Sequence, residues 1–372
     1  METLQLCAPC LFGIEGILGD ELRRMDAQQV NSQNGRVFFS GGADIIARAN
    51  IGSRYAERIQ IVIGRFTALS FEDLFQNVHG LPWERFIGKT DRFPVKGWSL
   101  ESKLHSIPDC QSIIKKAVAE RLKKSYNLSW FEETGSLYQI QFTILKDEVT
   151  ILIDTSGAGL HKRGYRAIAG GAPIKETLAA AIADLARVRK AKRVLDPCCG
   201  SGTLLIESAL SALRIAPGIR RKFISSSWNQ VPTEVWRQER ERARELELQD
   251  TDFSAWGGDI DPQAISLTMD NAKKAGVGNR ITAALANLSE FEPNSDGGVV
   301  LCNPPYGERL MDVPAAEGLI REMGRVFIPK PYWSYYIISS HDNFEELFGR
   351  QADKRRKLYN GMLRCQLYMY YR

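Results

Sequence analysis

The carboxyl-terminal half of the chain, from residue 173 to about residue 302, alternates between short apolar segments and segments of helical periodicity. The expected strands cover residues 193–196, 255–259, 281–286 and 299–302, and the expected helices cover residues 174–188, 203 onward and 262–275. Repeated strand–helix units of this kind form a parallel sheet with helices on both faces. The sequence therefore predicts an α/β fold with a doubly wound, mostly parallel sheet.

Two segments depart from this alternation. Near the end of the chain, strand-like stretches at 357–359 and 362–371 flank Asn360-Gly361, a dipeptide favoured in type I′ hairpin turns because both residues tolerate positive φ. We therefore expect an antiparallel hairpin at the end of the sheet. Residues 217–249 are rich in Arg and Glu and predict an insertion that ends in a solvent-exposed helix.

The amino-terminal part of the chain divides into two smaller units. Residues 1–58 predict a small α/β unit, and residues 59–155 predict a second unit with a basic helix around 113–124 and a hairpin turn at Lys146-Asp147. The basic residues of that helix that we select as candidate RNA contacts are Lys115, Lys116 and Lys123.

Residues 156–172 predict a linker that is rich in glycine and basic side chains. From composition alone, such a segment is a solvated connection. Its position directly before the α/β region also suggests a role in binding an RNA backbone or in fixing the orientation of the domains. The candidate residues are His161, Lys162, Arg163, Tyr165 and Arg166.

Composition limits the class of protein. A chain of 372 residues with 44% hydrophobic and 25% charged residues is a folded protein of two or three domains. Its net charge of +5 is compatible with a polyanionic partner. The seven scattered cysteines predict reduced thiols, and Cys7 and Cys10 lack the second ligand pair that a metal site needs. With no signal peptide and no apolar stretch long enough to span a membrane, we expect a cytoplasmic protein.

A candidate cofactor site follows the first strand of the α/β region. Asp196 stands at the end of the strand, and a glycine turn leads into the next helix, which lets a ligand approach the backbone closely. The turn has no P-loop lysine and lacks the third glycine of the dinucleotide fingerprint, so phosphate cofactors are disfavoured. The candidate residues here are Asp196, Cys199, Gly200, Ser201, Gly202 and Thr203.

A second acid, Asp259, ends the following strand, where doubly wound sheets usually hold ribose hydroxyls. Asp261 precedes Pro262 and is expected to cap a helix, whereas Ile260 is a candidate cofactor contact. Upstream of both acids, Lys175 and Thr177 either close one end of the cofactor site or are ordinary surface and helix-start residues.

Two acids without a basic phosphate clamp suit a cofactor that carries a cationic sulfonium and an amino-acid tail. The sequence thus points to S-adenosyl-L-methionine.

The candidate catalytic segment is Asn303-Pro304-Pro305-Tyr306, at the end of the fourth strand. The lone pair of an exocyclic amine is delocalised into the base, so the amine attacks poorly until hydrogen-bond acceptors favour a pyramidal nitrogen. Asn303 Oδ1 and the Pro304 carbonyl are two such acceptors, and the prolines restrict the backbone that carries them. Tyr306 offers a face on which an extruded base can stack. We therefore expect methyl transfer to an exocyclic amine, driven by positioning and electrostatics.

These motifs carry a resemblance to a known family. Residues 59–155 resemble a THUMP domain, an RNA-binding module, and nearly the whole chain resembles the THUMP-containing guanine-N2 RNA methyltransferases, above all the bacterial 23S rRNA family. The resemblance rests on the segments 161–166, 196–203 and 303–310. It implies a ferredoxin-like domain at 1–58 and a seven-stranded, Rossmann-like class I methyltransferase domain at 173–372. Where related enzymes often have an acid that contacts the cofactor adenine, this chain has Asn287, which we retain as a candidate.

Other functions remain open at this stage. The resemblance implies a guanosine in RNA, in ribosomal RNA or a precursor ribosomal particle, with transfer RNA as an alternative. The Asn-Pro-Pro-Tyr chemistry serves an adenine-N6 methyltransferase acting on RNA or DNA equally well. A non-catalytic RNA-binding assembly factor that keeps a methyltransferase-like shell is the third possibility, and the intact segment 303–306 argues against it.

Overall fold

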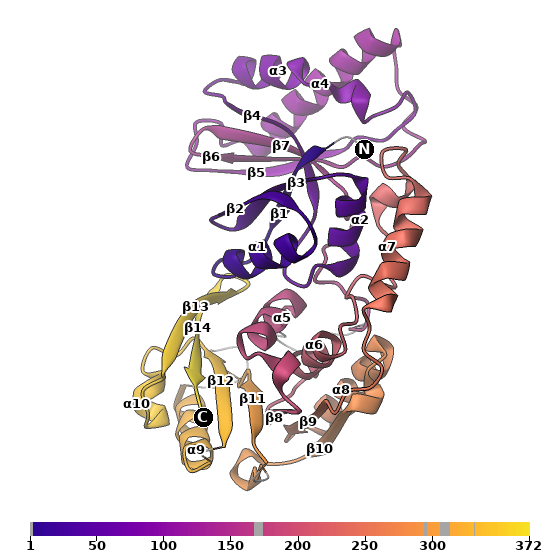
Figure 1. Cartoon of the computed structure of the whole chain (residues 1–372). Coiled ribbons are helices and arrows are strands. Elements are labelled where there is room, and N and C mark those ends of the chain that lie inside the picture. The colour runs from indigo at the N-terminus through magenta and orange to yellow at the C-terminus, as the bar shows by residue number, and fades with distance from the viewer. Residues whose placement is uncertain (1–2, 167–173, 294–295, 306–312, 331) are drawn as a thin grey trace.

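The chain forms two seven-stranded sheets, one above the other in Figure 1. The structure is a computed structural model that describes residues 3–166, 174–293, 296–305, 313–330 and 332–372. In these ranges no helix has the length and apolar character needed to cross a membrane.

The second sheet has the order β10-β9-β8-β11-β12-β14-β13 and is parallel apart from β14, which runs antiparallel to both of its neighbours. Its strands are β8 (Arg193–Asp196), β9 (Ser254–Asp259), β10 (Ile281–Leu285), β11 (Gly298–Cys302), β12 (Trp333–Ser339), β13 (Lys354–Asn360) and β14 (Leu363–Tyr370). Its helices are α5 (Glu176–Leu185), α6 (Thr203–Ala212), α8 (Pro262–Ala275), α9 (Val313–Phe327) and α10 (Phe344–Phe348). The predicted doubly wound α/β sheet is confirmed. The chain continues from β8 to one side, through β9 and β10, and returns to the other side at β11, so a topological switch point lies between β8 and β11.

The carboxyl-terminal hairpin is present, but its predicted turn is wrong. Asn360 pairs with Leu363 within the ladder, so the two-residue loop consists of Gly361 and Met362. Gly361 has φ of 66°, whereas Asn360 does not have a positive φ. A positive φ at the first loop residue alone belongs to a type II′ turn, not to type I′.

The first sheet has the order β2-β3-β1-β4-β7-β6-β5. Its strands are β1 (Leu4–Pro9), β2 (Gln28–Gln33), β3 (Arg36–Gly41), β4 (Gln60–Thr67), β5 (Val95–Leu100), β6 (Ile140–Leu145) and β7 (Glu148–Asp154), and its helices are α1 (Glu15–Arg24), α2 (Ala43–Gly52), α3 (Phe71–Gly80) and α4 (Ile107–Tyr126). Lys146 and Asp147 both have positive φ in the tight β6–β7 turn, as a type I′ turn requires. Because β1 pairs with β4, the two amino-terminal units share one continuous sheet.

The insertion between α6 and β9 contains the predicted charged helix near its end, and this helix is exposed on one face and packed on the other. Its helix, α7 (Thr233–Glu245), packs against α2 of the first sheet, and the side chains of Val235 and Trp236 are buried. Arg48 of α2 donates two hydrogen bonds to the carboxylate of Glu239, at 2.7 and 2.8 Å. The prediction of an exposed helix therefore holds for the outer face of α7, but it did not include this buried stripe. Helix α7 therefore joins the amino-terminal part of the molecule to the second sheet.

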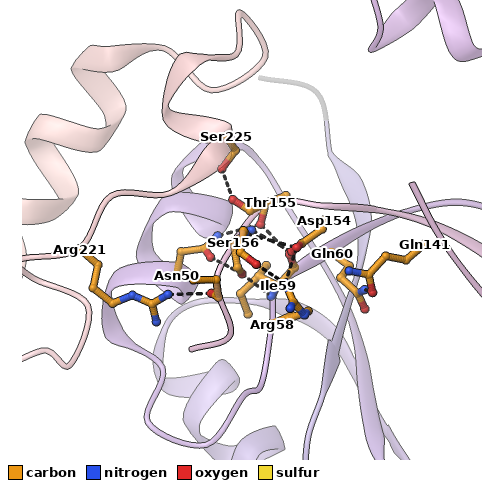
Figure 2. A network of polar contacts seen from close by, with 12 residues as sticks. Asn50, Arg58, Ile59, Gln60, Gln141, Asp154, Thr155, Ser156, Arg221 and Ser225 are labelled. Carbon is orange, nitrogen blue, oxygen red and sulfur yellow. Dashed lines mark hydrogen bonds and ion pairs between the residues drawn. The ribbon is translucent and has the colours of Figure 1, made fainter. Parts of the chain in front are cut away.

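A buried polar network forms a second junction, just after β7 (Figure 2). Ser225 of the insertion donates to the Thr155 carbonyl at 2.7 Å, and Asn50 of α2 donates to Thr155 Oγ1 at 2.8 Å. The Ser156 hydroxyl donates to Asn50 Oδ1 at 2.6 Å and accepts from the backbone N–H of Ile59 at 2.9 Å. Since these groups are buried, breaking one contact leaves another group without a partner, which makes the junction specific. Short 3-10 turns complete the structure at η1 (Trp83–Arg85), η2 (Val188–Lys190), η3 (Ile224–Ser227), η4 (Gly278–Arg280) and η5 (Leu288–Glu290).

Candidate active site

The turn between β8 and α6 adopts a shape that depends on glycine. Gly200 and Gly202 have φ of 54° and 75°. A Cβ added to Gly202 would lie 2.8 Å from Thr268 Cγ2, so both the backbone conformation and the available space require glycine there. Asp196, at the end of β8, accepts a hydrogen bond from the Cys198 N–H at 3.1 Å, which holds the start of the turn.

Helix α8 supports this turn from the side, through two residues that sequence reasoning missed. Thr268 Oγ1 donates to the Gly200 carbonyl at 2.9 Å, and Asn271 Nδ2 donates to the Ser201 carbonyl at 3.0 Å. Both side chains are fully buried. Their spacing of three places them on the same face of α8, and polar residues on the buried stripe of a helix were the available signal.

Asp259 lies beside the same turn, as predicted. Its Oδ2 accepts from the Gly200 N–H at 2.9 Å, and its Oδ1 accepts from the Asp261 N–H at 3.0 Å. Asp261 caps α8 by accepting from the Gln263 N–H at 2.8 Å, which confirms the capping role. Next to Asp259, the Ile260 side chain is 71% exposed and presents an apolar surface at this edge of the sheet.

Asn287 lies beyond the end of β10 and is exposed. Its side chain accepts from the Ser289 N–H at 3.0 Å and caps the short helix η5. The side-chain amide N–H groups have no hydrogen bond within the part of the chain that the structure describes. Contact with a cofactor adenine stays a prediction for this residue.

Asp196 is the most perturbed acid of the site. Its carboxyl group is buried, and burial raises the pKa of Asp196 to about 8; the hydrogen bond from the Cys198 N–H opposes this rise, and the charge of Asp259 adds to it. No basic side chain of the described ranges forms an ion pair with Asp196 or Asp259. A cationic group bound here would favour the ionised carboxylate. The acidic character of the site therefore fits the cationic cofactor S-adenosylmethionine, and the predicted contact of Asp259 with its ribose stays a prediction.

The catalytic candidates follow β11, directly beside β8 in the sheet. Asn303 Oδ1 is buried and has no hydrogen-bond partner among the described residues. Pro304 is buried and Pro305 is half-buried. Tyr306 falls outside the described residues, so its predicted stacking role stays untested. A buried acceptor without a donor is costly unless a ligand supplies one, which suits an acceptor meant for a substrate amine.

Three cysteines lie close to these acids. Burial raises the pKa of the Cys302 thiol, and its contact with Cys198 raises it further. Burial likewise raises the pKa of Cys199, whose Sγ lies 3.6 Å from Thr268 Oγ1. Thiols with raised pKa values are poor nucleophiles at neutral pH. Cys199 and Cys302 are therefore poor candidates for nucleophiles, and contact between Cys199 and the cofactor stays a prediction.

Lys175 and Thr177 converge on Glu57, which the sequence did not single out. Thr177 Oγ1 donates to Glu57 Oε1 at 2.7 Å, and Lys175 Nζ lies 3.4 Å from Glu57 Oε2. His161 Nδ1 lies 2.9 Å from the same Oε2. Burial alone would raise the pKa of Glu57, but the hydrogen bonds from His161 and Thr177 and the charge of Lys175 outweigh it and lower the pKa to about 2. Glu57 thereby ties the start of α5 to the amino-terminal part of the chain.

The structure contradicts two predicted RNA contacts, those of Arg163 and Tyr165. Both side chains are buried, at 8% and 3% exposure. Arg163 donates to the carbonyls of Leu160 and Arg54 at 2.6 and 2.5 Å, and Tyr165 donates to Glu207 of α6 at 3.0 Å. Groups enclosed in this way cannot reach an RNA backbone. Their contacts support the alternative role, which is fixing the orientation of the domains.

The other basic candidates differ in availability. Arg166 pairs with Glu176 at 3.0 Å and is half-buried, whereas Lys162 is exposed. On α4, Lys115 pairs with Glu133 at 2.6 Å. Lys116 and Lys123 on the same helix are exposed. Lys116 lies 3.9 Å from Glu120 in an exposed ion pair, which is weak and screened by salt. The RNA contacts of these exposed lysines stay predictions.

Comparison with known families places these features in context. A family model described as RMKL-like, methyltransferase domain matches residues 163–369, more than half of the chain. The chain belongs to the RMKL-like methyltransferase family. A model of the RlmL ferredoxin-like domain matches residues 5–60, and a THUMP domain model matches residues 68–154. The resemblance inferred from the motifs is therefore confirmed.

Two relatives carry names that mention RNA. The putative RNA methyltransferase YpsC of Bacillus subtilis is 41% identical over 100% of this chain and 97% of its own length. The ribosomal RNA large subunit methyltransferase K/L of Aeromonas salmonicida is 32% identical over 98% of this chain and 53% of its own length. The chain thus spans about half the length of the K/L protein.

Solved structures agree with the fold and with the cofactor. SMU.472, a putative methyltransferase complexed with S-adenosylhomocysteine, is 40% identical with a TM-score of 0.95, covering 100% of this chain and 98% of its own. A protein from Listeria monocytogenes, described as a predicted N6-adenine-specific DNA methylase, is 44% identical with a TM-score of 0.92, covering 100% of this chain and 97% of its own. S-adenosylhomocysteine is what remains of S-adenosylmethionine after methyl transfer. S-adenosylmethionine is accordingly the methyl donor of this enzyme.

Proposed function

We propose that this methyltransferase modifies the exocyclic N2 of a guanosine in RNA, with 23S ribosomal RNA as the substrate. The observation that carries the chemistry is the buried Oδ1 of Asn303, just after β11, which has no hydrogen-bond partner among the described residues. The neighbouring strand β8 ends at Asp196, where the glycine turn of the cofactor site begins. An acceptor for an amine and a site for a methyl donor thus lie at the carboxyl ends of two neighbouring strands.

The residues of the chain act by orienting the amine. Asn303 Oδ1 and the Pro304 carbonyl accept its two N–H groups, which favours a pyramidal nitrogen with its lone pair available for attack. When bound, S-adenosylmethionine supplies an electrophilic methyl group. Asp196 and Asp259 bind and orient the donor, and the amine releases its proton after the bond to carbon has formed. Because the acceptors are held in place before the reaction, positioning and electrostatics supply the catalysis.

RNA is the proposed substrate class because of the THUMP match at residues 68–154 and the names of the relatives. On this basis we assign residues 1–58 to a ferredoxin-like domain, 59–155 to the THUMP domain, 156–172 to a linker and 173–372 to the methyltransferase domain. Lys116, Lys123 and Lys162 are the exposed basic candidates for contact with the RNA backbone. The choice of guanine over adenine comes from the family resemblance, and a cytoplasmic location follows from a ribosomal substrate.

A second candidate is methylation of adenine N6. The description of the Listeria monocytogenes protein favours it, and the paired acceptors at Asn303 and Pro304 suit either exocyclic amine. The two candidates differ in the nucleoside that they produce, so product analysis separates them.

The test is to incubate the protein with isotopically labelled S-adenosylmethionine and ribosomal RNA from cells that lack the protein. The RNA is then digested to nucleosides. N2-methylguanosine in the large-subunit RNA is the expected product. N6-methyladenosine would establish the second candidate, and label confined to transfer RNA would refute the ribosomal substrate.

Asn303→Ala tests the mechanism within the same assay. Loss of one preorganised hydrogen-bonding group lowers turnover by about 100-fold to 1000-fold in comparable sites. We expect a loss of this size, with the affinity for S-adenosylhomocysteine changed by less than about twofold, because Asn303 acts on the amine. Asn229→Ala, at an exposed position of the insertion, is the matched control. Unchanged turnover in Asn303→Ala removes this residue from the mechanism.

A further inference from the structure

A basic cavity lies away from the methyl-transfer site. It has a volume of about 590 Å³ and is lined by the last turns of α6 and α8 together with residues 215–221 and 244–249 of the insertion. Helices α6 and α8 begin next to the cofactor turn, at Thr203 and Pro262, and run back along the sheet. The cavity therefore lies near the amino ends of the parallel strands. Asn303 lies at their opposite, carboxyl ends, since it directly follows β11.

The charges that line this cavity are strongly unbalanced. Six basic side chains contribute to its wall and only one carboxylate, that of Glu247. Within the described ranges, only Arg163 among these cations is in an ion pair, with Glu207 at 3.5 Å. The six basic residues are Arg163, Arg220, Arg221, Arg244, Lys274 and Arg280.

Three of these guanidinium groups have a buried nitrogen without a hydrogen-bond partner among the described residues. Arg163 Nε lies 3.5 Å from the carboxylate of Glu207, so the other two, Arg221 and Arg280, have donors left for a ligand. Arg221 Nη2 donates to the Ala158 carbonyl at 2.7 Å, but its Nη1 is buried without an acceptor among the described residues. Arg280 donates from both terminal nitrogens to backbone carbonyls at 2.9 Å, yet its Nε likewise lacks a partner there. Burial lowers the pKa of Arg221 to about 10, and the charges of Arg163 and Arg58 contribute. The backbone contacts hold both groups in place without neutralising them.

Helix dipoles account for only part of this accumulation of charge. The carboxyl end of a helix carries roughly half a negative charge, and α6, α7 and α8 all end at the cavity, so together they offset about one and a half positive charges. The Arg220 guanidinium is one cation stabilised in this way, because it donates a hydrogen bond at 3.2 Å to the carbonyl of Lys274 in the last turn of α8. Arg163 is buried and compensated by Glu207, so the other five cations and Glu247 leave four formal positive charges, and more than half of this charge has no partner among the described residues.

We propose that this cavity is a second RNA-binding site, which takes one nucleotide unit of the RNA strand with its flanking phosphates. The inference rests on the proposed function for its source of ligand. Phosphate oxygens match guanidinium groups in charge and geometry, and they supply the acceptors that Arg221 Nη1 and Arg280 Nε do not find among the described residues. The apolar part of the wall, at Leu210, Leu213 and Ile219, suits a ribose or base.

A double charge reversal, Arg244→Glu with Lys274→Glu, tests the site without disturbing the fold. Both side chains are exposed, and neither takes part in a hydrogen bond or ion pair within the described residues. The matched control is Lys354→Glu with Arg364→Glu, two exposed cations on the hairpin at the opposite edge of the sheet. Circular dichroism melts of both variants verify that they fold.

The measurement is the dissociation constant for a fluorescently labelled fragment of large-subunit RNA, followed by anisotropy over a range of salt concentrations. We expect the cavity variant to bind at least about tenfold more weakly at moderate salt, with the slope of log K against log salt reduced by about two, one for each lost phosphate contact. The control variant should match the wild type. Equal affinity and an equal slope in the cavity variant overturn the proposal.

Two further experiments are needed. The first distinguishes an RNA strand from a free nucleotide as the source of phosphate, and the second distinguishes failure of the cavity proposal from failure of the proposed function. Adenosine diphosphate is titrated in place of RNA; tight binding that the cavity variant abolishes, without any loss of RNA affinity, shows a free-nucleotide site and overturns the RNA assignment. Methyl incorporation by the wild type is measured in parallel. If the wild type methylates no RNA while the cavity variant still loses RNA affinity, the proposed function fails and the cavity site stands.

Discussion

The raised pKa of Asp196 makes cofactor binding dependent on pH. The buried carboxyl group has a pKa of about 8 in the free protein, mainly because of burial. A cationic cofactor interacts favourably with the ionised carboxylate, so binding removes the proton whenever the free protein holds it. We therefore predict that the affinity for S-adenosylhomocysteine, whose amino group is cationic, rises with pH and levels off above pH 8.

The magnitude follows from the fraction of protein in the ionised form. For a pKa of about 8, this fraction is about 9% at pH 7 and about 1% at pH 6. Apparent affinity falls in proportion to the fraction of protein that is competent to bind. The dissociation constant should thus fall about tenfold between pH 6 and pH 7 and about fivefold between pH 7 and pH 8.

Isothermal titration calorimetry in buffers of different ionisation enthalpy measures both the affinity and the number of protons released. The wild type should release about 0.9 proton per ligand at pH 7. Asp196→Asn is the matched control, because its side-chain oxygen can still accept the hydrogen bond from the Cys198 N–H. This variant should bind about tenfold to a hundredfold more weakly, since it lacks the charge, and without that proton release.

The free protein offers a second readout with a defined sign. The pKa of Asp196 is higher in the folded state than in the unfolded chain, where an aspartate titrates near 4. The stabilisation from its protonation is fully present below about pH 4 and is lost as the pH rises toward 8. Asp196→Asn should lose this part of the pH dependence of Tm. A wild-type affinity that is flat from pH 6 to pH 8, or equal proton release in the variant, would refute the reasoning.

Three further substitutions test the framework around the site. Tyr165→Phe removes the hydrogen bond to buried Glu207 and should lower the free energy of unfolding by about 1–3 kcal/mol in urea denaturation, and an unchanged midpoint contradicts the role of this contact. Gly202→Ala forces a Cβ against Thr268 at a positive φ, so we expect a weaker S-adenosylhomocysteine complex and a lower Tm, whereas normal affinity shows that the turn adapts. Glu57→Gln should lower Tm most above pH 5 and least near pH 3. The pKa of Glu57 is lowered to about 2 in the folded protein, so its ionised carboxylate stabilises the fold above the unfolded pKa, and this stability is lost as the pH falls toward 2. A difference in Tm that is constant with pH counts against the ionised carboxylate as the stabilising group.

Periodicity and local motifs predicted the catalytic sheet well. Strand β8 and helix α8 have the predicted bounds, because a buried strand and a capped helix both follow local rules of pattern and termination. The glycine turn at 200–202 and the cap at Asp261 were predictable for the same reason. The turn of the final hairpin was not, since pairing register along the whole ladder placed Asn360 in the strand.

Contacts between distant segments were beyond local reasoning. Glu57 and Thr177 are 120 residues apart, and Arg48 and Glu239 are 191 residues apart, so no short window contains either pair. The same limit led to the wrong assignments of Arg163 and Tyr165, because a basic and glycine-rich composition is typical of an exposed linker as well as of a packed junction.

The sequence alone determined the class of fold and the cofactor and supplied the prediction of an amine acceptor at Asn303, since each depends on residues that are close together along the chain. The tertiary structure decided how these parts are joined. It brought the Asp196 turn and Asn303 to neighbouring strands of one sheet, packed α7 against α2, and gathered the cations of the basic cavity from segments that are far apart in sequence. Burial and electrostatic fields depend on this assembly, and therefore the pKa of Asp196 and the charge of the cavity appear only in the folded molecule.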